Sequence, residues 1–316
     1  MGLAFVFPGQ GSQSVGMLSA LAAAVPSVRD LIGRADTALG ESLSSTIADG
    51  PAATLALTVH TQPAMLLAGF ACWSAWQEAG GQAPLALAGH SLGEYTALAV
   101  AGAFGFEDAV RVVRARAQAM QEAVPVGVGS MAAILGLDDD GVRRACALAG
   151  EELPGRLVAP ANWNAPAQVV IAGHADAVES ACGHARALGA KRAVTLPVSA
   201  PFHSALLQPA GERLATVLAG IEVHAPRWPV VNNVDVAVET DPARIRDALV
   251  RQASAPVRWV EVVQRLRAMG ATRIIEFGPG KVLAGLVTRI DRSLQVVSVH
   301  DPATLEAALA ATTGEG

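Results

Sequence analysis

Residues 83–101 read APLALAGHSLGEYTALAVA, an apolar run that meets a Gly-His-Ser-Leu-Gly turn and continues as a helix-forming segment. The run at 83–88 predicts a buried strand, and the small and apolar residues at 94–101 predict a helix. G-x-S-x-G between a strand and a helix is typical of the sharp turn that exposes a nucleophilic serine. We therefore predict that Ser91 is a catalytic nucleophile. An ordinary glycine-rich turn that happens to contain a serine is the alternative.

The composition limits the classes of protein to consider. The chain has 316 residues, and 52% of them are hydrophobic, which is enough for a sizeable core in one or two domains. The formal net charge is -5 and there is no long basic block, which argues against nucleic-acid binding and leaves only local basic patches for acidic partners. No apolar run reaches membrane-spanning length, and the N-terminus lacks a secretory signal.

The three cysteines, Cys72, Cys146 and Cys182, lie far apart and show no C-x-x-C spacing. Neither a disulfide framework nor a zinc site is therefore expected. A reducing cytoplasm fits this cysteine usage best. We predict a cytoplasmic protein that makes no membrane contact and holds no metal.

The order of expected strands and helices changes along the sequence and divides the chain into two kinds of segment. Residues 1–126 and 199–316 alternate between strands and helices, with expected strands at 4–7, 83–88, 229–232, 273–277 and 295–299. This alternation predicts an α/β core with a mostly parallel sheet.

The segment between these two parts, residues 127–198, has a different pattern. It reads as strand, helix, strand, strand, helix, strand, which is the ferredoxin-like (βαββαβ) order. The expected elements are strands at 131–137, 157–161, 168–172 and 192–198, with helices at 138–148 and 176–188. Asn162-Trp163-Asn164 falls between the two middle strands and reads as a break between them. We predict that residues 127–198 form an inserted subdomain.

A serine nucleophile needs a base, and histidine is the usual one. His203, in SAPFHS, stands where the chain leaves the inserted segment and re-enters the core, which is a natural wall for a cleft. His90 adjoins the serine, but neighbours in sequence point in different directions, so we expect it to pack within the turn. The other histidines lie in polar, helical or strand-end settings: His60, His174, His184, His224 and His300. His203 is the candidate base.

Two main-chain amides are candidates for binding an oxyanion. The amide of Leu92 lies at the start of the expected helix and can point outward. FPGQGSQ at residues 7–13 is a second glycine-rich loop after a strand, and the amide of Gln10 within it supplies a second donor. A phosphate-binding loop is the alternative, but the GK[ST] ending and the G-x-G-x-x-G spacing are both missing.

Arg116 lies in RVVRARAQAMQ, on a helix expected at about 107–122. Together with Arg111 and Arg114 it can form an ordinary solvated face, and the sequence alone favours that interpretation. An arginine that points into the cleft would instead bind a substrate carboxylate through its rigid guanidinium and select diacid thioesters.

Seven stretches together resemble the malonyl-CoA:acyl carrier protein transacylase family, and the likeness covers nearly the whole chain. They are FPGQGSQ, QPAML, GHSLGEY, Arg116 with AQAMQEAVPVGVGSMAAILG, NAPAQVVIAG, SAPFH and EFGPGKVL. The resemblance implies an α/β-hydrolase-like core with the ferredoxin-like insertion and an active site between them. The chain starts close to its first strand and ends soon after its last, which favours a free-standing enzyme of type II fatty acid synthesis. We expect a monomer.

The resemblance also implies a ping-pong reaction. The malonyl group passes from malonyl-CoA to Ser91, with His203 as the base and Arg116 binding the malonyl carboxylate. It then passes to the phosphopantetheine thiol of acyl carrier protein, so the enzyme needs no cofactor of its own. Three alternatives stay open: a serine thioesterase or esterase, the acyltransferase subunit of a malonate decarboxylase, and a catalytically silent carrier-binding module.

Further roles come from the resemblance alone. Gln10 and Leu92 supply the oxyanion amides, and the main-chain carbonyl of Gln252 orients the histidine. Asn162 lines the same cleft. The sequence by itself would favour a surface glutamine at a helix end for Gln252.

Overall fold

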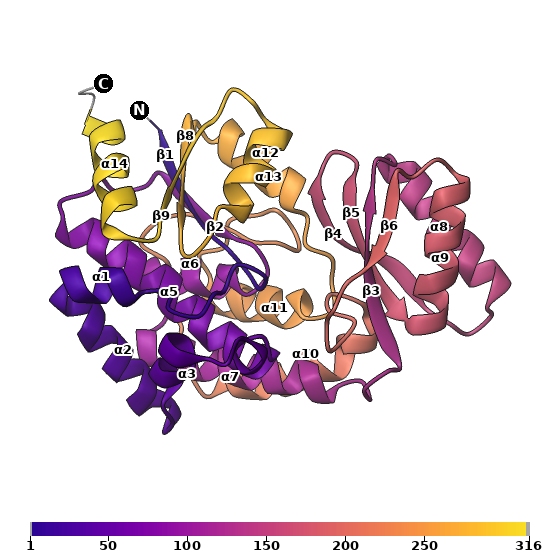
Figure 1. Cartoon of the computed structure of the whole chain (residues 1–316), viewed down its shortest axis with the longest axis horizontal. Helices are drawn as coiled ribbons and strands as arrows, with labels where there is room; N and C mark the ends of the chain where they lie inside the picture. The colour runs from indigo at the N-terminus through magenta and orange to yellow at the C-terminus, as the bar shows by residue number, and fades with distance from the viewer. Residues whose placement is uncertain (1, 314–316) are drawn as a thin grey trace.

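The computed structural model describes residues 2–313 and contains two separate β-sheets (Figure 1). The larger sheet has five parallel strands in the order β7-β2-β1-β8-β9. Its strands are β1 (Leu3–Phe7), β2 (Ala86–Gly89), β7 (Val230–Val231), β8 (Arg273–Phe277) and β9 (Gln295–Val299). The smaller sheet is antiparallel. These two sheets confirm the predicted α/β fold with a mostly parallel main sheet.

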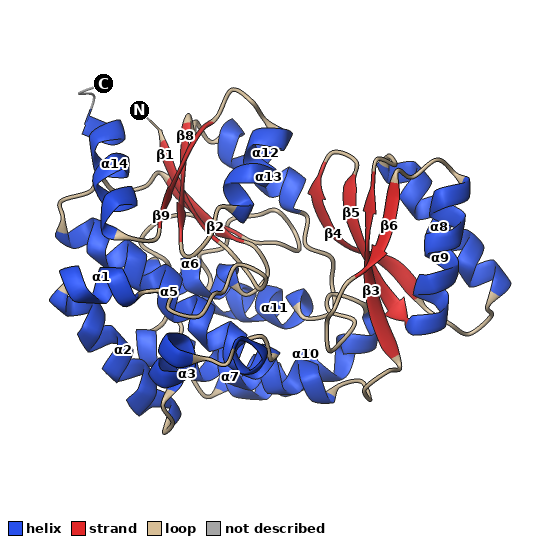
Figure 2. Cartoon of the chain, viewed as in Figure 1, coloured by secondary structure: helices blue, strands red, loops and turns tan. Residues whose placement is uncertain are grey.

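Fourteen α-helices and one short 3-10 helix lie within residues 2–313 (Figure 2). Before β2 come α1 (Ser19–Ala24), α2 (Pro26–Leu39), α3 (Leu43–Asp49), α4 (Ala52–Leu55) and α5 (Thr58–Glu78). After it come α6 (Gly93–Val100), α7 (Phe106–Glu122), α8 (Asp139–Glu152) and α9 (Ala175–Ala187). The remainder are η1 (Ala205–Leu207), α10 (Gln208–Ala219), α11 (Pro242–Gln252), α12 (Trp259–Ala268), α13 (Val282–Ile290) and α14 (Pro302–Thr313).

Strand β1 shows why the main sheet is covered on both faces. All five of its residues, LAFVF, are buried, and successive side chains point to opposite sides of the sheet. Phe5 and Phe7 pack in the core that includes α2, α5 and α7. Ala4 and Val6 pack in a second core with α12 and α13. A parallel strand buried in this way reads as a continuous apolar run, which is why the sequence predicts it well.

The smaller sheet contains β3 (Gly129–Leu135), β4 (Val158–Ala165), β5 (Gln168–His174) and β6 (Arg192–Thr195) in the order β4-β5-β3-β6. With α8 and α9 this gives the β-α-β-β-α-β order that the sequence predicts. The two helices cover the outer face of the sheet (Figure 1). The other face packs against residues of the core, including Met120 on α7 and Phe202. A cleft between the two sheets is therefore lined from both sides.

One boundary prediction inside this sheet is wrong. Asn162-Trp163-Asn164 is not a break, because β4 continues through all three residues to Ala165. The register of β4 against β5 shifts twice there, between Pro160 and Asn162 and between Trp163 and Ala165. This stretch also pairs in parallel with Val257. The main-chain nitrogen of Trp163 donates to the carbonyl oxygen of Val257, and the nitrogen of Val257 donates to the carbonyl oxygen of Ala161, each at 2.9 Å. The polar residues therefore belong to a strand that contacts the core segment after α11.

The other differences concern element ends. The strand expected at 83–88 is paired only from Ala86 to Gly89, and the one expected at 192–198 ends at Thr195. One hydrogen bond continues beyond each of these ends, from Leu85 N to Leu3 O at 2.8 Å and from Leu196 N to Met131 O at 2.9 Å, so the apolar pattern overestimates the strands by only a few residues. No helix among residues 2–313 is long and apolar enough to cross a membrane.

Candidate active site

Ser91 sits between the end of β2 and the start of α6, with a main-chain φ of 54°. The flanking glycines make this turn possible. A Cβ on Gly89 would lie 1.9 Å from the carbonyl carbon of Gly93, and a Cβ on Gly93 would lie 2.0 Å from the carbonyl oxygen of Phe7. Both positions therefore exclude any side chain, because the turn packs directly against its own helix and against β1.

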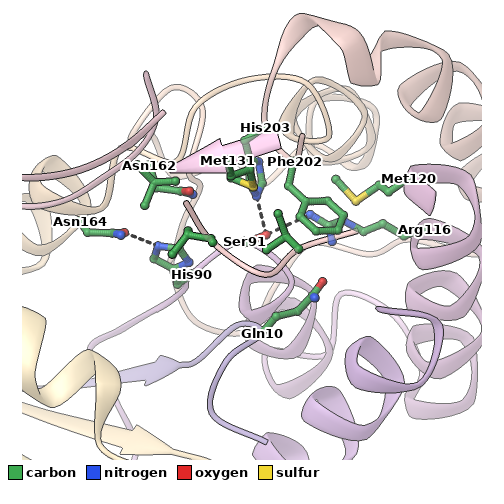
Figure 3. A pocket seen from close by; sticks show the side chains of 13 residues that line it. Gln10, His90, Ser91, Arg116, Met120, Met131, Asn162, Asn164, Phe202 and His203 are labelled. Atoms are coloured by element: carbon green, nitrogen blue, oxygen red, sulfur yellow. Dashed lines mark hydrogen bonds between the residues drawn. The ribbon is translucent and has the colours of Figure 1, made fainter. Parts of the chain in front are cut away.

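His203 meets the serine across the cleft, as the sequence predicts. Its Nε2 lies 2.6 Å from Ser91 Oγ (Figure 3). Its Nδ1 lies 3.0 Å from the carbonyl oxygen of Gln252 and 3.2 Å from that of Ala255. Carbonyl oxygens only accept, so the proton resides on Nδ1 and leaves Nε2 free to accept the serine proton. Main-chain carbonyls thus occupy the position that a carboxylate takes in a serine triad.

The electrostatics of the site keep this histidine neutral. Burial, followed by the positive charge of Arg116, lowers the pKa of His203 to about 3. Its two bonds to carbonyl oxygens act in the opposite direction but are weaker. A neutral imidazole at pH 7 is the form that can remove a proton.

Arg116 is buried, with 1% of its surface exposed, so the solvated-face interpretation is wrong. Its Nη2 donates to Ser91 Oγ at 3.2 Å and to Gln252 Oε1 at 3.0 Å, and its Nη1 donates to Gln62 Oε1 at 2.7 Å. The guanidinium also lies 5.3 Å from the ring centre of Tyr95. Its Nε–H has no hydrogen-bond partner among the residues that the structure describes.

A periodic signal for this burial exists in the sequence. The buried positions of α7 include Ala109, Val112, Val113 and Met120, and Arg116 continues that stripe. Arg114 lies two residues earlier, which is about 200° around a helix of 3.6 residues per turn. Arg114 bonds Glu41 and Arg111 bonds Asp108. The three arginines therefore do not share a face.

Gln252 is fully buried at the end of α11, so it is not a surface glutamine. Its main-chain carbonyl accepts a hydrogen bond from His203, and its side chain is hydrogen-bonded to three other groups. Oε1 accepts from Arg116, while Nε2 donates to the carbonyl oxygen of Ser91 at 3.0 Å and to Glu94 at 2.8 Å. One residue thus contacts the serine, the histidine and the arginine.

The two residues whose amides are predicted to bind the oxyanion lie close to Ser91: Leu92 follows it in the chain, and Gln10 lines the same cleft. Leu92 is buried at the N-terminal end of α6, and its main-chain N–H donates to none of the described residues. Gln10 lines the cleft with Ser91 (Figure 3). The Gln10 side chain is held by Thr58 at 2.7 Å and Gln62 at 3.3 Å.

The cleft has a volume of about 220 Å³. Polar groups gather around Ser91, and apolar side chains form the remaining wall. The lining residues are Gln10, His90, Ser91, Arg116, Met120, Met131, Asn162, Asn164, Val170, Leu196, Val198, Phe202 and His203. Asn162 is 7% exposed and comes from the smaller sheet, so that sheet supplies one side of the cleft (Figure 3).

Sequence reasoning missed several polar contacts that hold the turn. Asn233 Oδ1 accepts from the Ser91 amide at 2.8 Å, and Asn233 Nδ2 donates to the carbonyl of Gly89 at 2.7 Å. His90 bonds Asn164 at 2.8 Å, which ties the turn to the smaller sheet. Glu94 is the one carboxylate in the helix-forming segment 93–100, and that position in the sequence could have indicated a polar contact near the serine. Asn233 follows a two-residue strand, and nothing in the sequence around it indicates such a contact.

The described residues contain no group of three or more His, Cys, Asp or Glu side chains placed to hold a metal ion. A serine hydrogen-bonded to a neutral histidine, beside a buried arginine, is an arrangement that can carry out covalent acyl transfer.

Comparison with known proteins agrees with this chemistry. The acyl transferase domain family matches residues 4–305. The malonyl CoA-acyl carrier protein transacylase of Salmonella typhimurium is 53% identical over 306 residues, which cover 97% of this chain and 98% of that protein.

Two solved structures are similar in fold as well as sequence. The acyl-carrier-protein S-malonyltransferase of Burkholderia pseudomallei has a TM-score of 0.95 and 61% identity, covering 98% of this chain and 99% of the other. The other structure is a complex of a type II PKS acyl-carrier protein with its malonyl-transacylase. The similar chain in it has a TM-score of 0.96 and 49% identity, covering 99% of this chain and 100% of that chain.

Fold, site and relatives together define an acyltransferase. The chain belongs to the acyl transferase domain family and, within it, to the malonyl CoA-acyl carrier protein transacylases.

Proposed function

We propose that this protein transfers the malonyl group of malonyl-CoA to the phosphopantetheine thiol of acyl carrier protein, through a malonyl ester on Ser91. The observation that carries the proposal is the contact between Arg116 and Ser91. A buried guanidinium with donors to spare lies 3.2 Å from the nucleophile, where it can bind the carboxylate at the far end of a malonyl group. A simple acyl chain has no group for it.

In the first half of the reaction, His203 Nε2 takes the proton of Ser91 Oγ as that oxygen attacks the thioester carbonyl carbon. The carbonyl oxygen becomes an oxyanion, which the amides of Gln10 and Leu92 stabilise. The carbon–sulfur bond then breaks, and His203 returns the proton to the sulfur of coenzyme A. The malonyl group stays on Ser91 as an ester.

In the second half, the phosphopantetheine thiol enters the same cleft. His203 takes its proton, and the thiolate attacks the ester carbonyl through the same oxyanion position. The carbon–oxygen bond to Ser91 breaks, and the proton passes from His203 to the serine oxygen. The main-chain carbonyl of Gln252 holds the imidazole in the required tautomer throughout, at 3.0 Å from Nδ1.

The ester must survive until the carrier arrives. The apolar wall of the cleft, with Met120, Met131 and Phe202, limits access of water to the ester. Asn162, whose side chain also lines the cleft, takes part in binding the acyl or pantetheine chain. This retention of the acyl group separates the proposed transacylase from a thioesterase or esterase.

The cellular setting belongs to the same proposal. Acyl carrier protein as partner is supported by the similar malonyl-transacylase that was solved in complex with its carrier. We propose that the chain acts as a monomer in the cytoplasm, in fatty acid synthesis. We also propose that residues 1–126 and 199–316 form the catalytic core and that residues 127–198 form a subdomain that closes the cleft.

The test is the intact mass of the protein after brief incubation with malonyl-CoA, for the wild type and for Ser91→Ala. The wild type should gain one malonyl group and Ser91→Ala none. The adduct should persist in buffer and disappear when phosphopantetheinylated carrier protein is added. Rapid loss to water would indicate a hydrolase instead, and carrier binding without any adduct would indicate a silent binding module.

A further inference from the structure

Glu94, in the first turn of α6, is a buried carboxylate to which the reaction above assigns no role. Only 1% of its surface is exposed, and it follows Gly93 at the end of the serine turn. A buried carboxylate costs free energy unless it is hydrogen-bonded or paired. The contacts that offset this cost therefore indicate what the residue does.

One oxygen of Glu94 accepts two hydrogen bonds. Oε2 lies 2.8 Å from Nε2 of Gln252 and 2.9 Å from the main-chain nitrogen of Asn233. The Gln252 amide also donates to Ser91 O and accepts from Arg116. Because its nitrogen faces two acceptors and its oxygen faces a donor, the amide has only one satisfactory orientation. Glu94 thus fixes the residue that contacts all the main catalytic groups.

The same amide separates two opposite buried charges. Glu94 and Arg116 are each 1% exposed, and Gln252 bonds both of them. A carboxylate in direct contact with Arg116 would occupy the donors that a malonyl carboxylate needs. A carboxylate held behind the amide offsets part of the arginine charge and leaves those donors available.

We propose that Glu94 is a positioning residue, whose charge holds Gln252 and Asn233 in place and balances Arg116 without occupying it. The inference rests on the proposed malonyl transfer and extends it to a residue outside the cleft. Glu94 touches no reacting atom. It acts through Gln252 on the histidine and through Asn233 on the serine turn.

The protonation state of Glu94 gives the proposal an observable. Burial raises the pKa of Glu94 to about 7, while the bonds from Gln252 and Asn233 and the charge of Arg116 oppose that rise. The other ionisable groups around it are Tyr95 beside it on α6, Asp235 after β7, and Glu239 across a small pocket. The carboxylate therefore gains a proton as the pH falls through neutrality, and the holding charge is lost.

The experiment compares wild type with Glu94→Gln in malonyl transfer to carrier protein, from pH about 5.5 to about 9. The substitution keeps the size of the side chain and removes its charge. We expect kcat to fall about tenfold, as for the loss of one charged hydrogen bond, and KM for malonyl-CoA to stay the same or fall, because Arg116 loses its competing charge. The wild-type activity should decline toward acid pH and approach the level of the variant, which should lack that decline.

Glu276→Gln is the matched control. Glu276 is also buried, its pKa is also raised to about 7, and it bonds the amides of Leu283 and Ala284 away from the cleft. Its kcat, KM and pH profile should be those of the wild type. An equal loss of kcat in this control, or a rise of KM in Glu94→Gln in step with the lost kcat, would show a merely structural role and overturn the inference.

A second variant covers failure of Glu94→Gln to fold. Glu94→Asp keeps the charge on a side chain one methylene shorter, so kcat should fall while the acid decline persists; loss of that decline would contradict the role of the charge. Each series includes the intact-mass measurement on wild type. A wild type without a malonyl adduct overturns the proposed function itself, whereas a normal adduct with wild-type rates in Glu94→Gln overturns only the role of Glu94.

Discussion

The hydroxyl of Ser91 and Nε2 of His203 lie 2.6 Å apart, and both residues have a left-handed main chain, with φ angles of 54° and 59°. This conformation costs about 1–2 kcal/mol for a residue that has a Cβ. Surrounding contacts maintain it at both positions, through Asn233 on the Ser91 amide and Gln252 on the imidazole. The fold therefore stores strain on both sides of the reacting hydrogen bond.

This strain predicts an unusual order of stability for two inactive variants. Ser91→Ala and Ser91→Gly both lack the hydroxyl and differ only in Cβ. Glycine ordinarily destabilises by about 0.5–1 kcal/mol relative to alanine, but the left-handed φ reverses that order. We expect the free energy of unfolding of Ser91→Gly to equal or exceed that of Ser91→Ala, by up to about 1 kcal/mol. Urea denaturation of the two proteins measures it, and a clearly less stable glycine variant would argue against strain.

The carboxylate role of Arg116 predicts a change of acyl selectivity. Arg116→Ala should lower kcat/KM for malonyl-CoA by about tenfold to a hundredfold, the usual value of a hydrogen bond to a charged group. Transfer of a neutral acetyl group should be unchanged or should rise, because that substrate offers no partner to the guanidinium. Initial rates with both thioesters give the ratio.

Arg111→Ala is the control on the same helix. Arg111 is exposed, donates to Asp108 at 2.7 Å and does not line the cleft. Its kcat/KM for both thioesters should stay within about twofold of wild type, since exposed ion pairs contribute little. Equal losses for malonyl and acetyl transfer in Arg116→Ala would remove the carboxylate role.

Local patterns in the sequence predict much of this fold. The apolar runs of the buried parallel strands and the β-α-β-β-α-β order of the insertion each depend on residues that are close in the chain. The serine turn is equally local, because Gly89 and Gly93 are required by contacts within the turn and with β1. Arg116 is an intermediate case. The spacing of the apolar residues on α7 could have predicted that Arg116 is buried, but its nearness to Arg111 and Arg114 in sequence suggested a solvated face.

Local sequence patterns do not predict the residues that hold the serine turn and the histidine in place. Gln252 lies 161 residues from Ser91 in sequence, and Asn233 lies 142 residues from it. Nothing near either residue indicates that its amide is buried against the serine turn. The family resemblance identified the Gln252 carbonyl but not the contacts of its side chain with Arg116 and Glu94. Tertiary packing decides these contacts.

The lowered pKa of His203 predicts how stability depends on pH. Burial, with the charge of Arg116, lowers the pKa from 6.5 to about 3 in the native state, whereas the unfolded chain takes up a proton near 6.5. The unfolded state therefore binds more protons between these values, and the free energy of unfolding falls as the pH drops below about 6.5. The slope approaches about 1.4 kcal/mol per pH unit for one group.

Comparison with His203→Gln isolates this contribution. The variant has no imidazole, so its free energy of unfolding should fall less steeply than that of wild type from pH about 7 to about 4. Glu94 and Glu276 act in the opposite direction, because burial raises the pKa of each carboxyl to about 7, but both are present in both proteins. Parallel curves for the two proteins in urea would contradict a neutral, buried His203.

The last prediction concerns the two hydrogen bonds by which the Asn233 side chain holds the turn around Ser91. Asn233→Ala removes an acceptor for the Ser91 amide and a donor for the Gly89 carbonyl. Each buried group left without a partner costs about 1–3 kcal/mol, so we expect the free energy of unfolding to fall by about 2–6 kcal/mol. The rate of Ser91 acylation should fall at least tenfold as the turn relaxes. Asn232→Ala is the neighbouring control. That side chain accepts only from the Asp235 amide, at 2.7 Å, and its nitrogen has no partner among residues 2–313. The control should therefore lose about 1 kcal/mol and keep its acylation rate in a quenched-flow measurement with malonyl-CoA. If both variants lose the same stability and the same rate, Asn233 is an ordinary buried amide and the turn is held by its glycines alone.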